Sequence, residues 1–290
     1  MRSAFARSVQ RLKSQPCPKP EVWRPKPILS QALKGARQLR PLTLLLLSVL
    51  AFPLTLSKDA RAQARGGTAA PSSPREVAPI DLTGQWVAVI SEDWRWRMIT
   101  PPKGDIVSIP LNLQGQHVAE AWDPAKDEAA GEQCKAYGAP GLMRGPIRMR
   151  ISWLDMTTLK IETDYGMQTR LLRFANPGVQ PGPRSWQGAT TAEWIVRGGG
   201  RGSPRFGTLK TVTANLRPGY LRKNGVPYSE RAVFTEYWDV HTLPKGDKLL
   251  VNTNVVEDLV YLQLPFQTAI HYKFERDASK WDPTPCDARF

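Results

Sequence analysis

The stretch IRMRISWLDMTTLKIETDYGMQTRLLRF, residues 147–174, decides the fold class of this chain. Apolar residues occupy every second position from Ile147 to Trp153, and polar residues occupy the positions between them. Successive side chains of a β-strand point to opposite faces, so this alternation predicts a strand with one buried and one solvated face. Turn residues at Asp155 and at Asp164-Tyr165-Gly166 separate this run from two further short runs. The stretch therefore predicts consecutive antiparallel strands joined by tight turns.

The same kind of run recurs along the rest of the chain. Further runs rich in β-branched and aromatic residues are QWVAVI, DWRWRMI, TAEWIV, TLKTVTA, RAVFTEYWDV, DKLLVNTNVV and FQTAIHYKF. Turn-forming residues separate them, and Asn224-Gly225 is a strong signal for a tight turn. About ten strands in one domain predict an all-β, mostly antiparallel fold, either barrel-like or a sandwich, because both architectures protect sheet edges.

One short helical segment is predicted near residues 113–136. Asp123 can cap a helix, Pro124 suits the first helical position, and AKDEAAGEQC is rich in helix formers. We expect this segment to lie across one end of the β structure.

The basic charge of the chain is concentrated at its N-terminus. The formal net charge is +14, but residues 1–62 carry 12 Lys and Arg against two acidic residues, which leaves +4 for the remainder. A net charge of that size is ordinary for a solvated surface. The distribution therefore argues against nucleic acid as a partner.

Residues 1–62 are typical of an export signal. Arg37 and Arg40 precede the apolar run PLTLLLLSVLAFPLTL, and small residues in an A-x-A arrangement follow it. The run is shorter than the ~20 residues that cross a bilayer. We expect a cleaved signal peptide, with an uncleaved membrane anchor as the alternative. A start codon downstream of Met1 would explain the long basic region.

The domain organisation follows from the composition after the leader. Residues 63–79 are small and proline-rich, which predicts a flexible tether. Residues 80–290 are predicted to form a single β-rich domain, located in the periplasm or outside the cell. Cys134 and Cys286 remain after the leader, and an even number of cysteines in an oxidising compartment favours one disulfide. Two unpaired thiols are the alternative.

Several motifs carry a resemblance to known families. The motifs are AWDP with the Cys and G-x-P that follow it (Trp122 to Pro140), SWQG with a later EW (Ser185 to Trp194), LRPGYLRKNGVPYS (216–229), VEDLVYLQLPF (256–266) and the tail WDPTPC. From Asp81 to Cys286 the chain resembles a widespread, largely uncharacterised family of exported bacterial β-rich proteins. That resemblance implies fold and localisation and no activity.

A shorter motif points to a second resemblance. Gly84-Gln85-Trp86 resembles the G-x-W of lipocalins, early in the chain and at the start of a predicted strand. In lipocalins the Trp plugs the closed end of an antiparallel barrel whose open end binds an apolar ligand. The resemblance implies that Trp86 is a core plug.

The candidate catalytic residues lie in the C-terminal half. Asp239 and His241 share one face of a predicted strand, Glu257 lies at a strand end, and His271 lies on the more polar face of another strand. If the strands are neighbours, carboxylates can orient a histidine for acid–base catalysis, or the set can bind a divalent metal. The alternative is that these residues are ordinary surface residues. No H-E-x-x-H or C-x-x-C spacing occurs, so no metal and no cofactor are predicted.

The aromatic residues give the leading functional hypothesis. In DWRWRM, predicted as a second strand, Trp94 and Trp96 alternate with Arg95 and Arg97, which can bind an anionic head group. With Trp238 they are the candidate ligand-binding residues, because tryptophans suit a pocket. We expect an exported barrel that binds a small apolar or amphipathic ligand without catalysis.

Two functional alternatives remain, a periplasmic hydrolase or isomerase and a structural module of the cell envelope. The expected partner is a small molecule, with no nucleic acid and with membrane contact only through an uncleaved leader. No oligomeric state is predicted.

Overall fold

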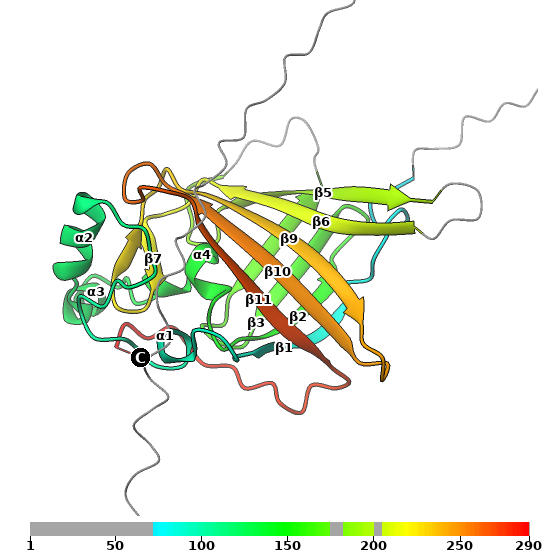
Figure 1. The fold of residues 1–290 in the computed structure, drawn as a ribbon, viewed down its shortest axis with the longest axis horizontal. Coiled ribbons are helices and arrows are strands. Elements are labelled where there is room, and N and C mark those ends of the chain that lie inside the picture. The colour runs from blue at the N-terminus through cyan, green and yellow to red at the C-terminus, as the bar shows by residue number, and fades with distance from the viewer. Residues whose placement is uncertain (1–71, 175–181, 200–204, 290) are drawn as a thin grey trace, which may run out of the picture. The chain divides into compact units, whose positions relative to one another are not determined.

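In the computed structural model, nine strands form a closed barrel (Figure 1). The structure describes residues 72–174, 182–199 and 205–289. The barrel strands are β1 (Gly84–Val89), β2 (Arg148–Trp153), β3 (Thr158–Thr163), β4 (Thr169–Phe174), β5 (Ala189–Gly198), β6 (Arg205–Ala214), β9 (Val233–Thr242), β10 (Lys248–Glu257) and β11 (Phe266–Glu275). Their order around the barrel is β1-β11-β10-β9-β6-β5-β4-β3-β2. Strands β7 (Gly219–Arg222) and β8 (Val226–Tyr228) form a separate hairpin.

Antiparallel pairing dominates the barrel, as predicted. Eight of the nine neighbouring pairs are antiparallel, and β4 pairs with β5 in parallel. The first strand closes the barrel, because β1 pairs with both β11 and β2. Closure removes the free sheet edges. The all-β class with short helical segments is thus confirmed, and the architecture is a barrel.

The alternation within the strands separates core from surface. Ile147, Met149 and Ile151 are buried, while Arg148 and Arg150 between them are only partly buried. Trp86 is 1% exposed, and its indole nitrogen donates to the carbonyl of Leu82. Trp86 is therefore a core residue of the first strand, as the sequence predicts.

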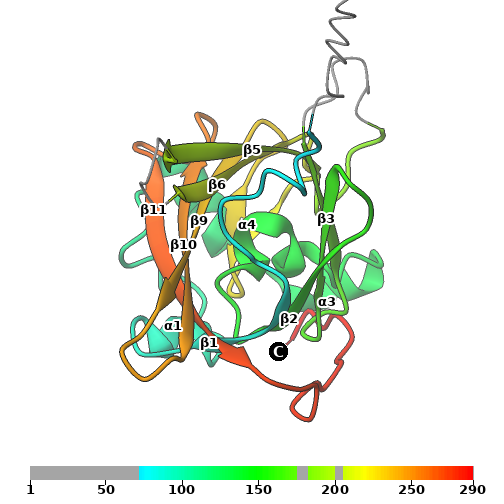
Figure 2. The same cartoon turned by 90° about the vertical axis from the view of Figure 1, so that its right-hand side faces the viewer.

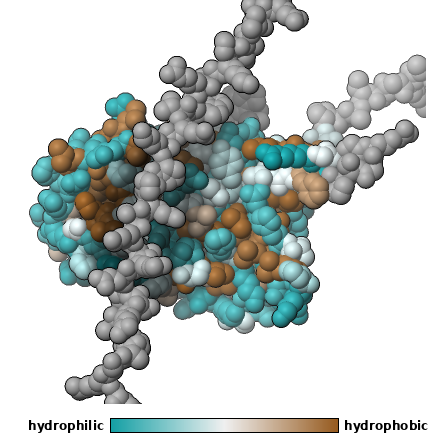
Figure 3. All heavy atoms as spheres, viewed as in Figure 1, coloured by the Kyte–Doolittle hydropathy of each residue, from teal (hydrophilic) through white to brown (hydrophobic). Residues whose placement is uncertain are grey.

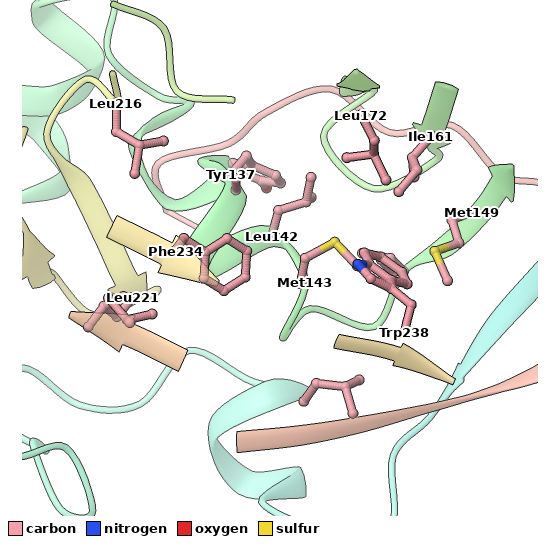
Figure 4. Packing of buried hydrophobic residues seen from close by; sticks show 14 of the residues in the cluster. Tyr137, Leu142, Met143, Met149, Ile161, Leu172, Leu216, Leu221, Phe234 and Trp238 are labelled. Carbon is pink, nitrogen blue, oxygen red and sulfur yellow. The ribbon is translucent and has the colours of Figure 1, made fainter. Parts of the chain in front are cut away.

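Short helices occupy one end of the barrel. They are α2 (Leu113–Glu120), α3 (Pro124–Ala129), the 3-10 helix η1 (Lys135–Tyr137) and α4 (Ala139–Leu142). Seen along the barrel, α4 lies across its far end (Figure 2). Leu142 and Met143 point from α4 into the interior, where Trp238 and Phe234 also lie (Figure 4). These side chains help to fill that end of the barrel.

The predicted helical segment is divided in the structure. Asp123 has extended backbone angles (φ −147, ψ 104) and its side chain accepts a hydrogen bond from the backbone N–H of Ala125, so a second helix begins at Pro124. A residue before proline is disfavoured in the helical conformation. Helix α2 therefore ends at Glu120, and α3 starts after the cap at Asp123 that the sequence identifies.

The prediction of a strand at DWRWRM is wrong. Residues Trp94–Arg97 form a short helix, α1, which Asp93 precedes in the left-handed conformation (φ 54). Trp96 donates from its indole nitrogen to Asp105, and Arg97 is buried beside Glu92. A four-residue alternation is too short to distinguish a strand from one helical turn, and these tertiary contacts favour the turn.

The first and last segments that the structure describes both contact the rest of the fold. Residues 72–79, the end of the predicted tether, contact it: Trp194 donates to the carbonyl of Pro74 across 2.8 Å. Cys134 and Cys286 are joined by a disulfide, with their Cα atoms 5.1 Å apart, which ties the C-terminal tail to the segment before η1.

The predicted leader and residues 63–71 lie outside the described residues. Within the described ranges, no helix has the length and apolarity needed to cross a bilayer.

A buried ion pair crosses the barrel interior. Arg170 of β4 donates from Nη1 and Nη2 to Glu236 of β9, across 3.0 and 2.5 Å, and both side chains are at most 1% exposed. Thr211 donates to the same carboxylate. A buried charge is tolerated where a partner and hydrogen bonds compensate it. The pair therefore links β4 to β9, which β5 and β6 separate in the barrel wall.

Candidate functional site

All four candidate catalytic residues lie on the outward-facing side of the barrel strands. Val251 of β10 pairs with Asp239 on one side and with His271 on the other, so these two residues share one row across three strands. Two strand spacings separate their Cα atoms by about 10 Å. Asp239 accepts a hydrogen bond from Thr208, and the Nδ1 atom of His271 lies 3.9 Å from the carboxylate of Glu92.

The remaining candidates lie further away. His241 pairs with Leu249 at the exposed end of β9, and Glu257 ends β10 six residues beyond Val251, about 20 Å along the strand. The structure therefore does not bring the four residues to a common substrate. Among the described residues, no group of three or more His, Cys, Asp or Glu side chains is placed to hold a metal.

The structure brings only some of the candidate ligand-binding residues together. Trp238 faces the barrel interior, fully buried, and donates to Thr211. Trp94 is 61% exposed at the start of α1. Trp96 and Arg97 line a pocket at the helical end of the barrel, and Arg95 stacks on Trp96 next to it.

This pocket is the candidate site, and we call it the basic pocket. Segments from α1, α4, β7 and the β3–β4 turn enclose it, and the lining residues are Trp96, Arg97, Ala136, Gly141, Arg144, Gly145, Tyr165, Leu221, Arg222 and Lys223. The cavity volume is about 20 Å³, within an open hollow of about 310 Å³. About one water-sized group fits the cavity itself. The pocket is therefore suited to one small polar group at a time.

Hydrogen bonds to the protein fix the three arginines of the pocket. Arg97 donates from Nε to the carbonyl of Arg144 (2.9 Å) and from Nη1 to Glu92 (2.7 Å). Arg144 donates from Nη2 to Asp93, across 3.4 Å. Arg222, at the end of β7, donates to the backbone carbonyls of residues 105 and 107. The guanidinium groups are thus held in place by residues on both sides of α1 and by the backbone that follows α4.

Each of these arginines also keeps a buried nitrogen without a hydrogen-bond partner in the described structure. The three nitrogens are Nη2 of Arg97, Nη1 of Arg144 and Nε of Arg222, on residues that are only 2, 6 and 4% exposed. A buried donor without a partner costs about 1–3 kcal/mol, and more when it belongs to a charged group. The three arginines line one pocket, so an acceptor bound there is the natural partner for their unused donors.

The charge balance of the site is positive. Five cations lie at or beside the basic pocket, and three carboxylates accompany them; the cations are Arg95, Arg97, Arg144, Arg222 and Lys223, and the carboxylates are Glu92, Asp93 and Asp105. Lys223 aside, the four arginines exceed the three carboxylates by one positive charge. Such an excess in a desolvated site favours an anion.

The pKa values at the site reflect this crowding of positive charge. Burial, together with the charge of Arg144, lowers the pKa of Arg222 to about 10. Burial also lowers the pKa of Arg144, although Asp93 opposes the change, and burial lowers that of Lys223. Burial acts to raise the pKa of Asp105, but the Trp96 hydrogen bond and nearby cations outweigh it and lower that pKa overall.

Aromatic rings support the cations of the pocket. The guanidinium of Arg222 lies 5.0 Å from the ring centre of Trp96, and the ammonium of Lys223 lies 5.1 Å from that of Tyr165. Stacking of this kind orients a cation without using its hydrogen-bond donors. Nε of Arg222 therefore stays available to an oxyanion such as carboxylate or phosphate.

The sequence alone did not point to Arg144, Arg222 or Lys223 as site residues. The signal present was the basic pair of Arg222 and Lys223 directly before the predicted Asn224-Gly225 turn.

The chain was also compared with protein-family models, curated proteins and solved structures, and none of them matched it.

Proposed function

We propose that this chain is an exported, non-catalytic binding protein whose ligand presents an anionic group to the basic pocket. The observation that carries the proposal is the set of three buried guanidinium groups with unpartnered nitrogens around one pocket. Buried polar groups in proteins are nearly always hydrogen-bonded, so an exception at a cavity points to a ligand. The scattered positions of the candidate catalytic residues give the hydrolase alternative no comparable support.

An anion would relieve two unfavourable features of the site at once. It would accept hydrogen bonds from the unused donors, and it would balance the excess positive charge. The closed cavity has room for little more than one oxygen-sized group, so the part of the ligand that enters is its charged group. The pocket therefore takes only the head group of the ligand, and the rest of the ligand lies outside it.

Calorimetric titration with inorganic phosphate and with acetate tests the proposal. Lys223→Met removes one pocket cation, and Lys248→Met is the matched control, because Lys248 is also half-buried and lies 5.4 Å from the ring centre of Phe274. We expect Lys223→Met to weaken anion binding about tenfold or more, the loss of about one charged contact. The control should bind like the wild type. Absence of binding by both anions, or equal weakening in both variants, would contradict the proposal.

A further inference from the structure

An apolar groove lies next to the basic pocket. It is an open hollow of about 530 Å³, lined by Ser108, Ile109, Pro110, Leu264, Pro265, Phe266 and Gln267. Its walls are tied together, because the backbone N–H of Gln263 donates to the carbonyl of Pro110 and Leu111 forms a β-bridge with Leu262. We call it the apolar groove. The two segments that form it are therefore held side by side.

Two arginines connect the groove to the basic pocket. The guanidinium of Arg144 lies 5.0 Å from the ring centre of Phe266, which lines the groove. Arg222 donates to Ser108, another groove residue, across 3.3 Å. Both arginines line the basic pocket as well. A charged site and an apolar surface thus adjoin through shared side chains.

The groove exposes apolar side chains to solvent. Ile109 and Phe266 form a buried floor, whereas Leu264 is 67% exposed and Val107, which precedes the groove, is 62% exposed. Apolar side chains reach the surface at this helical end of the molecule and also along the barrel wall (Figure 3). Exposed apolar surface beside a cluster of positive charge is typical of a binding site for molecules with both characters.

We infer that the ligand is a free single-chain amphiphile, with a carboxylate or phosphate head group in the basic pocket and an alkyl chain along the apolar groove. This inference rests on the proposed function. The charge of the pocket selects an anionic head group, and the adjoining groove removes the chain from water on one side. The groove is open, so the affinity depends on chain length less steeply than in an enclosed cavity.

Chain length and head group can be varied separately in solution. Each fully buried methylene group strengthens binding about fourfold, and each methylene group with one side exposed to water strengthens it about twofold. Decanoate should therefore bind the full-length protein at least about tenfold more tightly than hexanoate. The titration keeps decanoate below the concentration at which it forms micelles. Neutral 1-decanol should bind more weakly than decanoate. Equal affinities for hexanoate and decanoate would overturn the inference and leave the proposed function intact if phosphate still binds.

A variant of the groove locates the chain. Leu264→Gln should weaken decanoate binding about fourfold, as for the loss of one buried methylene, and leave phosphate binding unchanged. Leu154→Gln is the matched control, because Leu154 is similarly exposed (57%) but lies after β2, away from the groove. Equal effects of the two substitutions on decanoate binding would overturn the inference. So would cosedimentation with phosphatidylglycerol vesicles that decanoate does not displace, since it would indicate docking on a membrane.

Discussion

Glu236→Gln is expected to destabilise the barrel by about 3–5 kcal/mol, because it leaves the guanidinium of Arg170 buried without a counter-charge. The two side chains lie almost completely inside the barrel and form two parallel hydrogen bonds. Unit charges about 3 Å apart interact by about 5–6 kcal/mol at an effective dielectric constant of 20. Glutamine preserves the shape and one acceptor oxygen, so part of this interaction survives. The expected loss of stability is therefore smaller than the full interaction between the two charges.

Equilibrium unfolding in urea, followed by tryptophan fluorescence, measures the effect. Glu193→Gln is the control, since Glu193 pairs with Lys210 on the exposed outer wall, and its urea midpoint should stay close to that of the wild type. Arg170→Met combined with Glu236→Leu should cost less than Glu236→Gln alone, because no charge then remains unpaired. A loss of less than about 1 kcal/mol for Glu236→Gln would show that the buried pair matters little for stability, and so would a double variant less stable than Glu236→Gln.

Three further predictions concern other contacts. Reduction of the Cys134–Cys286 disulfide, which closes a loop of 152 residues, should lower the free energy of unfolding by up to about 5 kcal/mol; urea midpoints with and without reductant test this, and an unchanged midpoint contradicts it. Gly225→Ala should cost more than Gly246→Ala in urea unfolding. Both glycines have a positive φ, which alone costs about 1–2 kcal/mol, but only at Gly225 would the added Cβ lie 2.2 Å from a neighbouring indole. Asp105 has a folded pKa below its unfolded value, so its stabilising contribution is complete above about pH 4 and is lost as the pH falls through the folded pKa. Asp105→Asn should accordingly reduce the acid sensitivity of the urea midpoint, and an unaltered pH profile would argue against that role.

The strands could be predicted from sequence because their signal is local. Alternation over six or more residues, as in residues 147–153, fixes both the strand and its buried face, and turn residues such as Asn224-Gly225 fix its ends. The cap at Asp123 was equally visible, because its side chain acts on a backbone N–H two residues away. The segment at Trp94–Arg97 was not predictable in this way. Its helical turn depends on Asp105 and Arg144, which lie elsewhere in the chain.

The residues of the candidate site are harder to predict from the sequence, because they come from separate parts of the chain. Trp96 and Arg97 were identified because they form an unusual pair in a short stretch, and both line the basic pocket. Arg144 and Arg222 have no local sequence signal that joins them to α1, and only the packing of α4 and β7 brings them there. Conversely, Trp238 was grouped with the others by residue type, yet its place on β9 directs it into the barrel. Residue type thus indicates what chemistry a side chain can perform, while the tertiary fold determines which side chains lie together.

The most direct test of an anion held by the buried arginines is a crystal structure of the protein with 10-bromodecanoate, recorded at the bromine absorption edge. We expect a carboxylate within hydrogen-bonding distance of Arg97 Nη2 and Arg144 Nη1, and a bromine peak in the apolar groove between Ile109 and Leu264. A ligand bound inside the barrel, or arginine nitrogens contacted by water alone at saturating ligand, would contradict it.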